Sequence, residues 1–579
     1  TSKVLDQPRL RFALRKAVNN IQFAGVTILT IAAILRFLFS IVICVSIIVI
    51  SSNFYTTRHD NFENIGQIGE VRKGLDLAIF RMLNYWSAQL GIDANIEEIN
   101  QSLGLTWDYQ DLVTDSAESI LADVTKAISA SENLGRLMSL TKLADDENIY
   151  DKSEEYLFDQ PVTLCSDNAT NLFLTYASFR CMSFYIANQI AINANLSAVY
   201  PGEPHLWKNN DGLCEVIMNR HRIVSALTTE SRVFIEREIA ASTDVNHTIL
   251  LLYAILIPLT FLLFIVIFAI GYLKMNSEFS YIFNIFKLLP TEIYKEASKP
   301  IALFKSDGND QTKNATQIEN QKCKRILIPF TAIVSSIVIT VAVSLSIYFV
   351  DQSNHKFLVL NRWLEIGARR TPLLLEALIN AHYSIIFGYI GPTLYTNSSY
   401  HLQQFIDNAN DLLNQHHVLI WGSNETTTCN NFDKRLDAIH FNNGCEIDMH
   451  GKYVHHAYSC LSLDQLIISF IKYSSDLQQV IRLASEEPYD PSAEFNNNFK
   501  VMFRTSVYIN YQHLGFVHLF PKLEEAQEIL NDGINTQIIE LKKVTLIISI
   551  TALVIELILF VIDVFLLNNL YQICKVVRI

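Results

Sequence analysis

The sequence has few charged residues and little glycine or proline. Charged side chains make up 18% of its 579 residues, whereas an ordinary soluble protein has about 25%. Its 13 prolines and 19 glycines follow no period, which excludes a collagen-like chain. Basic residues (45) are fewer than acidic ones (58), and this balance argues against a nucleic-acid-binding protein. Half of the residues are apolar, which excludes a disordered chain.

Motifs of known chemistry are also lacking. The sequence contains no HExxH zinc motif, no phosphate-binding Walker loop, no GxGxxG, no GxSxG and no kinase signature. It has no CxxC pair and no tight Cys/His cluster, so we expect neither a metal site nor a cofactor. We interpret the doublets His416–His417 and His455–His456 as solvated, since adjacent residues on a helix or strand point apart. We therefore expect no enzyme activity from this chain itself.

What the sequence does have is four long apolar runs, and a bilayer-spanning helix needs about 20 such residues. Arg36 interrupts the first run, 21–52, and we place its span at about 37–55. The residues before this span lie along the inner surface or form the lower part of one tilted helix. The other spans are 248–272, 326–350 and 544–567. Runs of this length favour membrane helices over buried core helices.

The segments between the runs predict a regular organisation. Residues 53–247 and 351–543 form two large domains, and residues 273–325 form a short loop between the second and third spans. Residues 1–20 form a basic N-terminal segment, and residues 568–579 form a short tail. The order span–domain–span occurs twice, which is typical of a duplicated unit. However, the first cysteine lies at a different distance from the start of each domain. Duplication therefore stays open.

Charge predicts which way the protein faces. The first large domain has 14 basic and 28 acidic residues, and the second has 14 and 21. The short loop instead has nine basic and six acidic residues, and five basic residues lie in the first 20 positions. The positive-inside rule places both termini and the loop in the cytoplasm and both large domains outside. We expect a multi-pass protein whose first partner is the lipid bilayer, in the plasma membrane.

Glycosylation sequons and cysteines agree with an outer location of the large domains. The candidate acceptors are Asn100, Asn168, Asn195, Asn397 and Asn424. Six of the nine cysteines also lie in these domains, where disulfides can form. An equal spacing of 16 favours the pairs Cys165–Cys181 and Cys429–Cys445. Each domain then has one cysteine left over, unless a bridge joins the two domains.

Three charged residues lie inside the apolar runs: Arg36 in the first, and Glu556 and Asp563 in the fourth. Glu556 and Asp563 are seven residues apart, so a helix places both on one face. Charges in the apolar layer are costly and are usually paired or functional. We expect Arg36 to pair with Asp563, because both lie toward the inner side. The cluster is then either a clamp between helices or part of a proton or ion pathway.

The large domains are predicted to be mainly helical. Apolar residues recur at three- and four-residue steps in segments 65–90, 110–143, 215–241, 358–389, 402–419, 461–485 and 522–543. The last of these runs directly into the fourth span. In segment 500–519, apolar and polar residues alternate in part, which is also compatible with strands. The predicted fold class is a mostly α membrane protein with four transmembrane helices and two large, mainly helical extracytoplasmic domains.

The short inner loop contains an aromatic and apolar stretch, 279–304, with Leu288, Leu289 and Pro290 as its motif. Such a segment can lie on anionic lipid or dock on an intracellular signalling partner. In this motif and in the order of spans and loops, the chain resembles the membrane portion of large protist multi-pass signalling proteins. These include the Tiny macrocysts B/C-like family and the related receptor-type adenylate and guanylate cyclases.

The resemblance implies a sensory membrane protein, and it also has a limit. In the cyclases a catalytic domain follows the last membrane segment, whereas only residues 568–579 follow it here, so no cyclase residue can be carried over. The sequence begins with Thr rather than Met, which is compatible with a piece of a longer protein. The predicted function is signalling from an unknown extracellular ligand, with possible self-association. A transporter or channel and a surface adhesion protein are the alternatives.

Overall fold

The structure, a computed structural model, describes the following residue ranges, some of which contain short gaps. They are 24–89, 119–130, 160–166, 171–177, 185–193, 211–227, 262–287, 311–392, 396–442, 458–487, 495–502 and 505–578, with four single residues between 251 and 259. The described residues are mostly helical. The chain divides into two compact units. Unit 1 comprises Thr1–Tyr55, Thr243–Asn354 and Ile539–Ile579, and unit 2 comprises Thr56–Ser242 and His355–Ile538.

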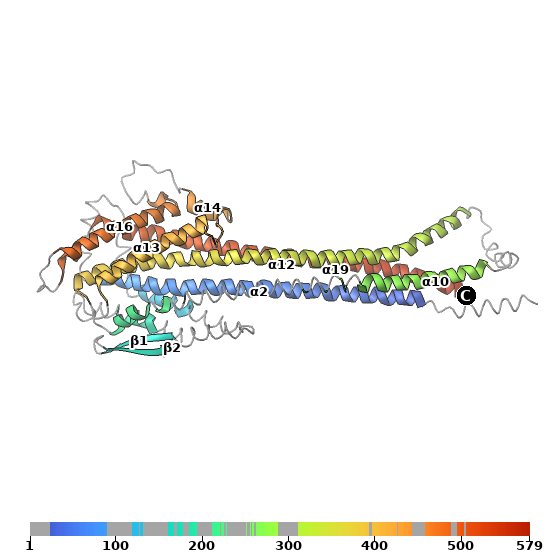
Figure 1. Ribbon diagram of the computed structural model, residues 1–579, viewed down its shortest axis with the longest axis horizontal. Helices are drawn as coiled ribbons and strands as arrows, with labels where there is room; N and C mark the ends of the chain where they lie inside the picture. The colour runs from blue at the N-terminus through green and yellow to red at the C-terminus, as the bar shows by residue number, and fades with distance from the viewer. Residues whose placement is uncertain are drawn as a thin grey trace, which may run out of the picture. The chain divides into compact units, whose positions relative to one another are not determined.

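Three long helices run through unit 1 (Figure 1): α2 (Ala24–Gln89), α12 (Gln311–Ile390) and α19 (Phe520–Arg578). Each is long and apolar enough to cross a membrane, which indicates membrane association. Helix α2 begins well before residue 37 and has no break at Arg36, so the residues before the predicted span form the lower part of one helix. All three helices continue from the apolar segments into unit 2, and for α19 the sequence predicts this directly.

Of the predicted span 248–272, the structure describes residues 262–272 and four single residues before them. Its described part contains a short π-helix, η1 (Leu262–Val266), which is followed by α10 (Ile267–Lys287). Helix α10 packs on α2 so closely that a Cβ on Gly25 would lie 2.4 Å from the backbone nitrogen of Met275. The backbone N–H of Gly25, in the first turn of α2, also donates to the Glu278 carboxylate at 3.2 Å. An acidic group at this position stabilises a helix N-terminus.

Unit 1 has polar residues inside and apolar residues outside. Exposed apolar side chains line the outward faces of its helices and include Ile31, Leu38, Val42, Leu262, Ile337, Val341, Ile547, Val561 and Phe565. Buried polar side chains lie between the helices and include Arg36, Ser40, Thr331, Ser335, Ser353, Thr545, Glu556 and Asp563. A water-soluble helix bundle has polar side chains outside and apolar side chains inside. Apolar outer surface on this scale therefore favours contact with lipid.

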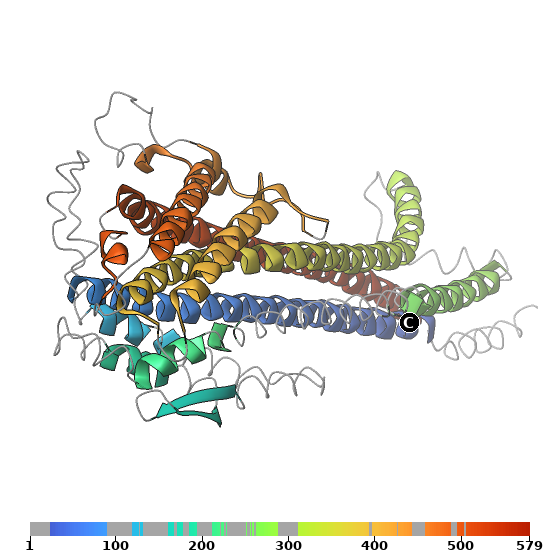
Figure 2. The ribbon, with the colours of Figure 1, turned by 60° about the vertical axis from the view of Figure 1, so that its left-hand side comes forward.

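Unit 2 joins the two segments that we expected to be separate domains. It contains α13 (Ser398–Trp421), α14 (Lys434–Phe441), α16 (Leu463–Glu486), α17 (Asn497–Met502), α18 (Ser506–Gln512) and the π-helix η2 (His513–Leu519). Helices α13 and α16 lie side by side (Figure 2). Asn397 caps α13, and Ser462 with Gln465 forms a capping box on α16. The strand interpretation of segment 500–519 is wrong, because its described residues are almost all in these helices.

A two-stranded antiparallel hairpin, β1 (Gln160–Ser166) and β2 (Asn171–Ala177), was not expected from the sequence. Its edge is covered by the helix at 211–220. The Asn219 side chain donates to the Thr163 carbonyl at 2.8 Å and accepts from the Thr163 N–H at 2.7 Å. Glu215 accepts from the Cys165 N–H at 3.1 Å. These side chains hydrogen-bond the backbone groups at the edge of β1 that a third strand would otherwise pair with.

The disulfide predictions are wrong. Cys165 is bonded to Cys214 rather than to Cys181, because the hairpin edge holds the 211–220 helix against β1 with the two Cα atoms 6.3 Å apart. Cys429 is a buried free thiol, whereas Cys460 is disulfide-bonded, so Cys429 does not pair with Cys445. Burial raises the pKa of the Cys429 thiol to about 11, which keeps it protonated at neutral pH.

Several predicted features lie outside the described residues. They are Cys181, Cys445, the sequons at Asn100, Asn168 and Asn195, and the motif of Leu288, Leu289 and Pro290. The sequon residues Asn397 and Asn424 are described, and both are exposed. They stay candidates for glycosylation.

Candidate functional site

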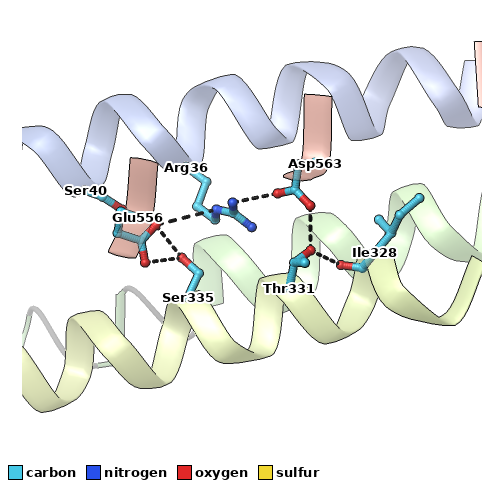
Figure 3. Close-up of polar contacts among 7 residues, drawn as sticks. All are labelled: Arg36, Ser40, Ile328, Thr331, Ser335, Glu556 and Asp563. Carbon is cyan, nitrogen blue, oxygen red and sulfur yellow. Dashed lines mark hydrogen bonds and ion pairs between the residues drawn. The ribbon is translucent and has the colours of Figure 1, made fainter. Parts of the chain in front are cut away.

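The three charged residues of the apolar runs meet in one cluster inside unit 1 (Figure 3). Helix α2 contributes Arg36, and α19 contributes both Glu556 and Asp563. Helix α12 faces them with Thr331 and Ser335. Each of the three charged residues is at most 1% exposed. We call this group, together with Ser40, the buried charge cluster.

Asp563 is the main partner of Arg36, as the sequence predicts. The Nη2 atom of Arg36 lies 2.6 Å from Oδ2 of Asp563, which is ion-pair distance. The Thr331 hydroxyl lies 2.5 Å from Oδ1 of the same carboxylate and 2.7 Å from the carbonyl of Ile328. Asp563 therefore connects α2, α12 and α19 at a single point.

Glu556 is held mainly by hydroxyl groups. Ser335 Oγ lies 2.7 Å and 2.8 Å from the two carboxylate oxygens, and Ser40 Oγ lies 3.4 Å from one of them. The nearest Arg36 nitrogen, Nε, is 4.0 Å away. Glu556 thus also connects all three helices, but with a weaker contact to the positive charge than Asp563 has.

Apolar layers enclose the cluster on both sides. Toward the start of α2, buried residues of α2, α10, α12 and α19 pack together, among them Leu29, Phe268, Ile328 and Leu566. Toward unit 2, a second layer contains Ile43, Ile339, Val343 and Ala552. The Arg36 guanidinium also lies 5.4 Å from the centre of the Phe268 ring, at cation–π distance. In such surroundings an unpaired charge is expensive, so each charged group depends on its partners.

The charges of the cluster do not cancel. One guanidinium faces two carboxyl groups, so the formal charge is −1 when both carboxyls are ionised. The excess can be removed by one proton or one bound cation. The geometry therefore has two chemical capabilities: it ties three helices together, and it offers a carboxyl group that can hold a proton.

A second polar contact joins the same three helices at the far end of the apolar segments. The Tyr55 hydroxyl lies 3.4 Å from Ser353 Oγ and 3.3 Å from Thr545 Oγ1, and all three side chains are buried. Tyr55 is 19 residues after Arg36, which corresponds to about 28 Å along a helix. That length is close to the apolar thickness of a bilayer, about 30 Å. We call this contact the hydroxyl junction.

Sequence reasoning found the charges but missed the hydroxyl groups that hold them. Ser40 lies four residues after Arg36, and Ser335 lies four residues after Thr331. Residues at this spacing share one face of a helix. Serine and threonine residues repeated on one face of an apolar run could have predicted these hydroxyl groups, because such residues hydrogen-bond between helices in membranes.

The histidine doublet of unit 2 is only half solvated. His417 is exposed, but His416 is fully buried, with its ring 3.3 Å from Arg370 Nη1 and 3.2 Å from Asp464 Oδ1. His440 also faces Arg370, at 3.1 Å. His455 and His456 lie outside the described residues. Within the described part of the chain, no group of three or more His, Cys, Asp or Glu side chains is placed to hold a metal ion.

Comparison of the chain with protein-family models, with curated proteins and with solved structures finds no match. The resemblance to protist signalling proteins therefore stays a prediction.

Proposed function

We propose that the chain is a multi-pass signalling protein of the plasma membrane with its termini in the cytoplasm. In this proposal, an event in unit 2, outside the cell, shifts the helices that cross the bilayer. The supporting observation is that α2, α12 and α19 each run from an apolar segment of unit 1 into unit 2 without a break. The Cys165–Cys214 disulfide supports an outer location for unit 2, since disulfides persist in oxidising compartments.

Continuous helices suit this role because a helix resists bending over a few turns, so a displacement at one end reaches the other. Apolar side chains that face lipid favour no particular register between two helices. Buried polar contacts between helices do favour one register. The buried charge cluster and the hydroxyl junction provide such contacts near the two ends of the apolar segments. A signal requires two arrangements of these helices with different affinity for the stimulus.

A break in α19 just after the boundary between the two units tests the proposal. Lys542 and Lys543 are exposed residues in the part of α19 that precedes the apolar segment. Lys542→Gly with Lys543→Gly weakens the helix there by about 2 kcal/mol. The pair Lys542→Ala with Lys543→Ala is the matched control, because it removes the same charges and keeps the helix.

Nanobodies raised against unit 2 serve as the stimulus, on the full chain in lipid nanodiscs. Hydrogen exchange of residues 24–40 and 556–572 reports the inner ends of the helices. We expect nanobody binding to change the exchange of residues 556–572 in the wild-type protein and in the alanine pair, and to change it less in the glycine pair, because only α19 is broken there. An equal change in the glycine pair, or no change in the wild-type protein with any of the bound nanobodies, contradicts the proposal.

Ion transport is a second candidate, favoured by the imbalance of one guanidinium against two carboxyl groups. If Glu556 or Asp563 carries a proton or cation, reconstituted vesicles should show a flux that Glu556→Gln with Asp563→Asn abolishes. A folded wild-type protein without proton or cation flux contradicts this candidate and leaves the cluster as a clamp between helices.

A further inference from the structure

Arg370 is a fully buried arginine without an acidic partner. It lies in the part of α12 that belongs to unit 2, and it is 0% exposed. Burial lowers the pKa of its guanidinium to about 10, which still leaves it charged at neutral pH. Among the described residues, no carboxylate pairs with it, and its Nε and Nη2 atoms have no hydrogen-bond partner. A buried charge usually has an opposite charge beside it, so the groups that Arg370 does contact are unusual.

Two histidine rings stand where an acidic partner is expected. Arg370 Nη1 lies 3.3 Å from Nδ1 of His416, on α13, and 3.1 Å from Nε2 of His440, on α14. An arginine has only donors, so both ring nitrogens accept and neither of them carries a proton. The proton of His416 is then on Nε2, which donates to Asp464 Oδ1 at 3.2 Å. Both rings are therefore neutral in this structure, and we call Arg370, His416 and His440 the arginine–histidine group.

A second proton on either ring conflicts with this arrangement. It would occupy the nitrogen that accepts from Arg370, and that hydrogen bond would be lost. It would also place a new positive charge at hydrogen-bond distance from the guanidinium. Burial, and after it the charge of Arg370, accordingly lower the pKa of His440 to about 2. An opened arrangement in which the rings titrate near their ordinary pKa of about 6.5 can take up these protons, so acid favours it.

The surrounding charged groups do not remove this conflict. They come from α13, from α14, from α16 and from the segment between α13 and α14, and they are His417, Cys429, Asp437 and Asp464. Asp464 favours a proton on His416. Among the described residues no carboxylate acts on His440, where Arg370 and His416 both oppose a proton. Acid therefore acts most directly on the contact between α14 and α12.

Helix α14 is an element that can move at low cost. It has eight residues, and Leu436 and His440 are its buried side chains. Its Arg435 pairs with Asp532 of α19 at 2.8 Å, but both side chains are more than half exposed, and such pairs contribute little. Short elements with few buried contacts open most readily. The hydrogen bond between Arg370 and His440 is thus a main contact that holds α14 on α12.

We propose that the arginine–histidine group is a proton switch, in which acid outside the cell protonates His416 and His440 and releases α14 from α12. The ligand of this site is the proton itself. Helix α12 carries Arg370 and continues into the apolar segment of unit 1, so the release changes the contacts of a helix that enters that segment. This inference names a stimulus for the proposed signalling function, and it rests on that function only for the outer location and for the consequence of the release.

Labelling of the Cys429 thiol measures the release. Cys429 is 1% exposed, lies between α13 and α14 in the sequence and is close enough to Arg370 to interact with its charge. The reagent is dithiodipyridine, a disulfide that reacts with thiols in acid as well as at neutral pH. Peptide mass spectrometry gives the labelling rate at Cys429 in the full chain in nanodiscs, relative to the denatured chain at the same pH.

We expect the protection of Cys429 to fall between pH 7.5 and pH 5 by about 30-fold for each histidine that takes up a proton. The reason is that labelling proceeds through the opened form, whose population rises by this factor. Equal protection at the two values of pH contradicts the proposal.

Two substitutions assign the effect to the rings. His416→Asn and His440→Gln each keep an acceptor for Arg370 that does not titrate. We expect each single variant to reduce the change in protection by about 30-fold, and the double variant to show none. If the double variant does not fold, His440→Gln alone carries the test. A change as large in His440→Gln as in the wild-type protein overturns the switch.

His382→Gln is the matched control, at another buried histidine of unit 2. His382 is 2% exposed, and its ring lies 2.7 Å from the Tyr508 hydroxyl, outside the arginine–histidine group. We expect it to leave the acid response of Cys429 as in the wild-type protein. If acid instead unfolded unit 2 as a whole, His382→Gln would reduce the response as much as His440→Gln does. That result overturns the local switch.

The two proposals fail in different ways. Hydrogen exchange of residues 327–340, in the apolar segment of α12, is compared between the wild-type protein and His440→Gln, both at pH 5. Acid-dependent labelling of Cys429 with equal exchange in the two proteins contradicts the proton as a signal and leaves the switch standing. A nanobody response without acid-dependent labelling contradicts the switch and leaves signalling standing.

Discussion

At the scale of single residues, the decisive feature is a charge that cannot reach water. Arg36 is 1% exposed, and its guanidinium has Asp563 as its close ion-pair partner at 2.6 Å. Removing one member of a buried pair leaves an uncompensated charge, whereas replacing both by apolar residues is often neutral or stabilising. Single and double variants of this pair can therefore separate the effect of the buried charge from the effect of the packing around it.

Asp563→Leu is expected to destabilise unit 1 by about 3–5 kcal/mol, because Arg36 then stays buried without its close partner. Adding Arg36→Met should recover most of this loss. The measurement is unfolding of the purified chain in mild detergent, followed by circular dichroism. Ile558→Val, on the exposed face of the same helix, is the control and should change stability little. A double variant as unstable as Asp563→Leu would show that the ion pair is not what holds these helices.

At the scale of elements, close helix contacts depend on small residues. Gly388 lies near the end of α12, where a Cβ would come within 2.2 Å of the buried Phe499 ring of α17. Gly66 lies in α2, where a Cβ would meet no atom of the described residues within 4 Å. Both glycines are in helices, so their intrinsic helix propensities are the same and only the surroundings differ.

Gly388→Ala is expected to destabilise unit 2 by about 1–3 kcal/mol, since the added methyl group displaces a packed ring. Gly66→Ala is its matched control and should stabilise by about 0.5–1 kcal/mol through backbone entropy. Chemical denaturation of both variants measures the difference. Equal stabilisation by the two substitutions would mean that α12 and α17 do not pack as described.

At the scale of the whole molecule, unit 2 is sensitive to acid because it buries neutral histidines. Burial lowers the pKa of His382 and of His401 to about 3, that of His416 to about 4 and that of His440 to about 2. In the unfolded chain each would titrate near 6.5. Below that pH the unfolded state binds protons that the folded state does not, so acid favours unfolding.

We expect unit 2 to lose about 1–2 kcal/mol of stability per buried histidine between pH 6.5 and 5. Asp76 acts in the opposite sense, since burial raises its pKa to about 6, but it is a single group. Denaturation at pH 7.5 and at pH 5 measures the loss, and His440→Gln should make it smaller. Equal stability at both values of pH would contradict the neutral, buried state of these rings.

The features predicted correctly from the sequence are those that depend on neighbours along the chain. Apolar run length predicted α2, α12 and α19, and helical periodicity predicted that they continue beyond the apolar segments. The seven-residue spacing of Glu556 and Asp563 placed both on one face, and depth in the bilayer then selected Asp563 as the partner of Arg36. In each case the determining information lies within one helix or in the energetic cost of burying a charge in an apolar layer.

Only the tertiary structure decided the features that depend on residues distant in sequence. The Cys165–Cys214 bond follows from the helix at 211–220 lying on the hairpin edge, which an equal spacing of cysteines cannot indicate. His416 is buried because Arg370 and Asp464 come from other helices. Residues 56–242 and 355–538 form one unit although apolar segments separate them in the sequence. The sequence by itself determined the long apolar helices and the charges inside them, because both depend on neighbours along the chain. The fold decided which residues distant in sequence meet, because those contacts depend on how the helices pack.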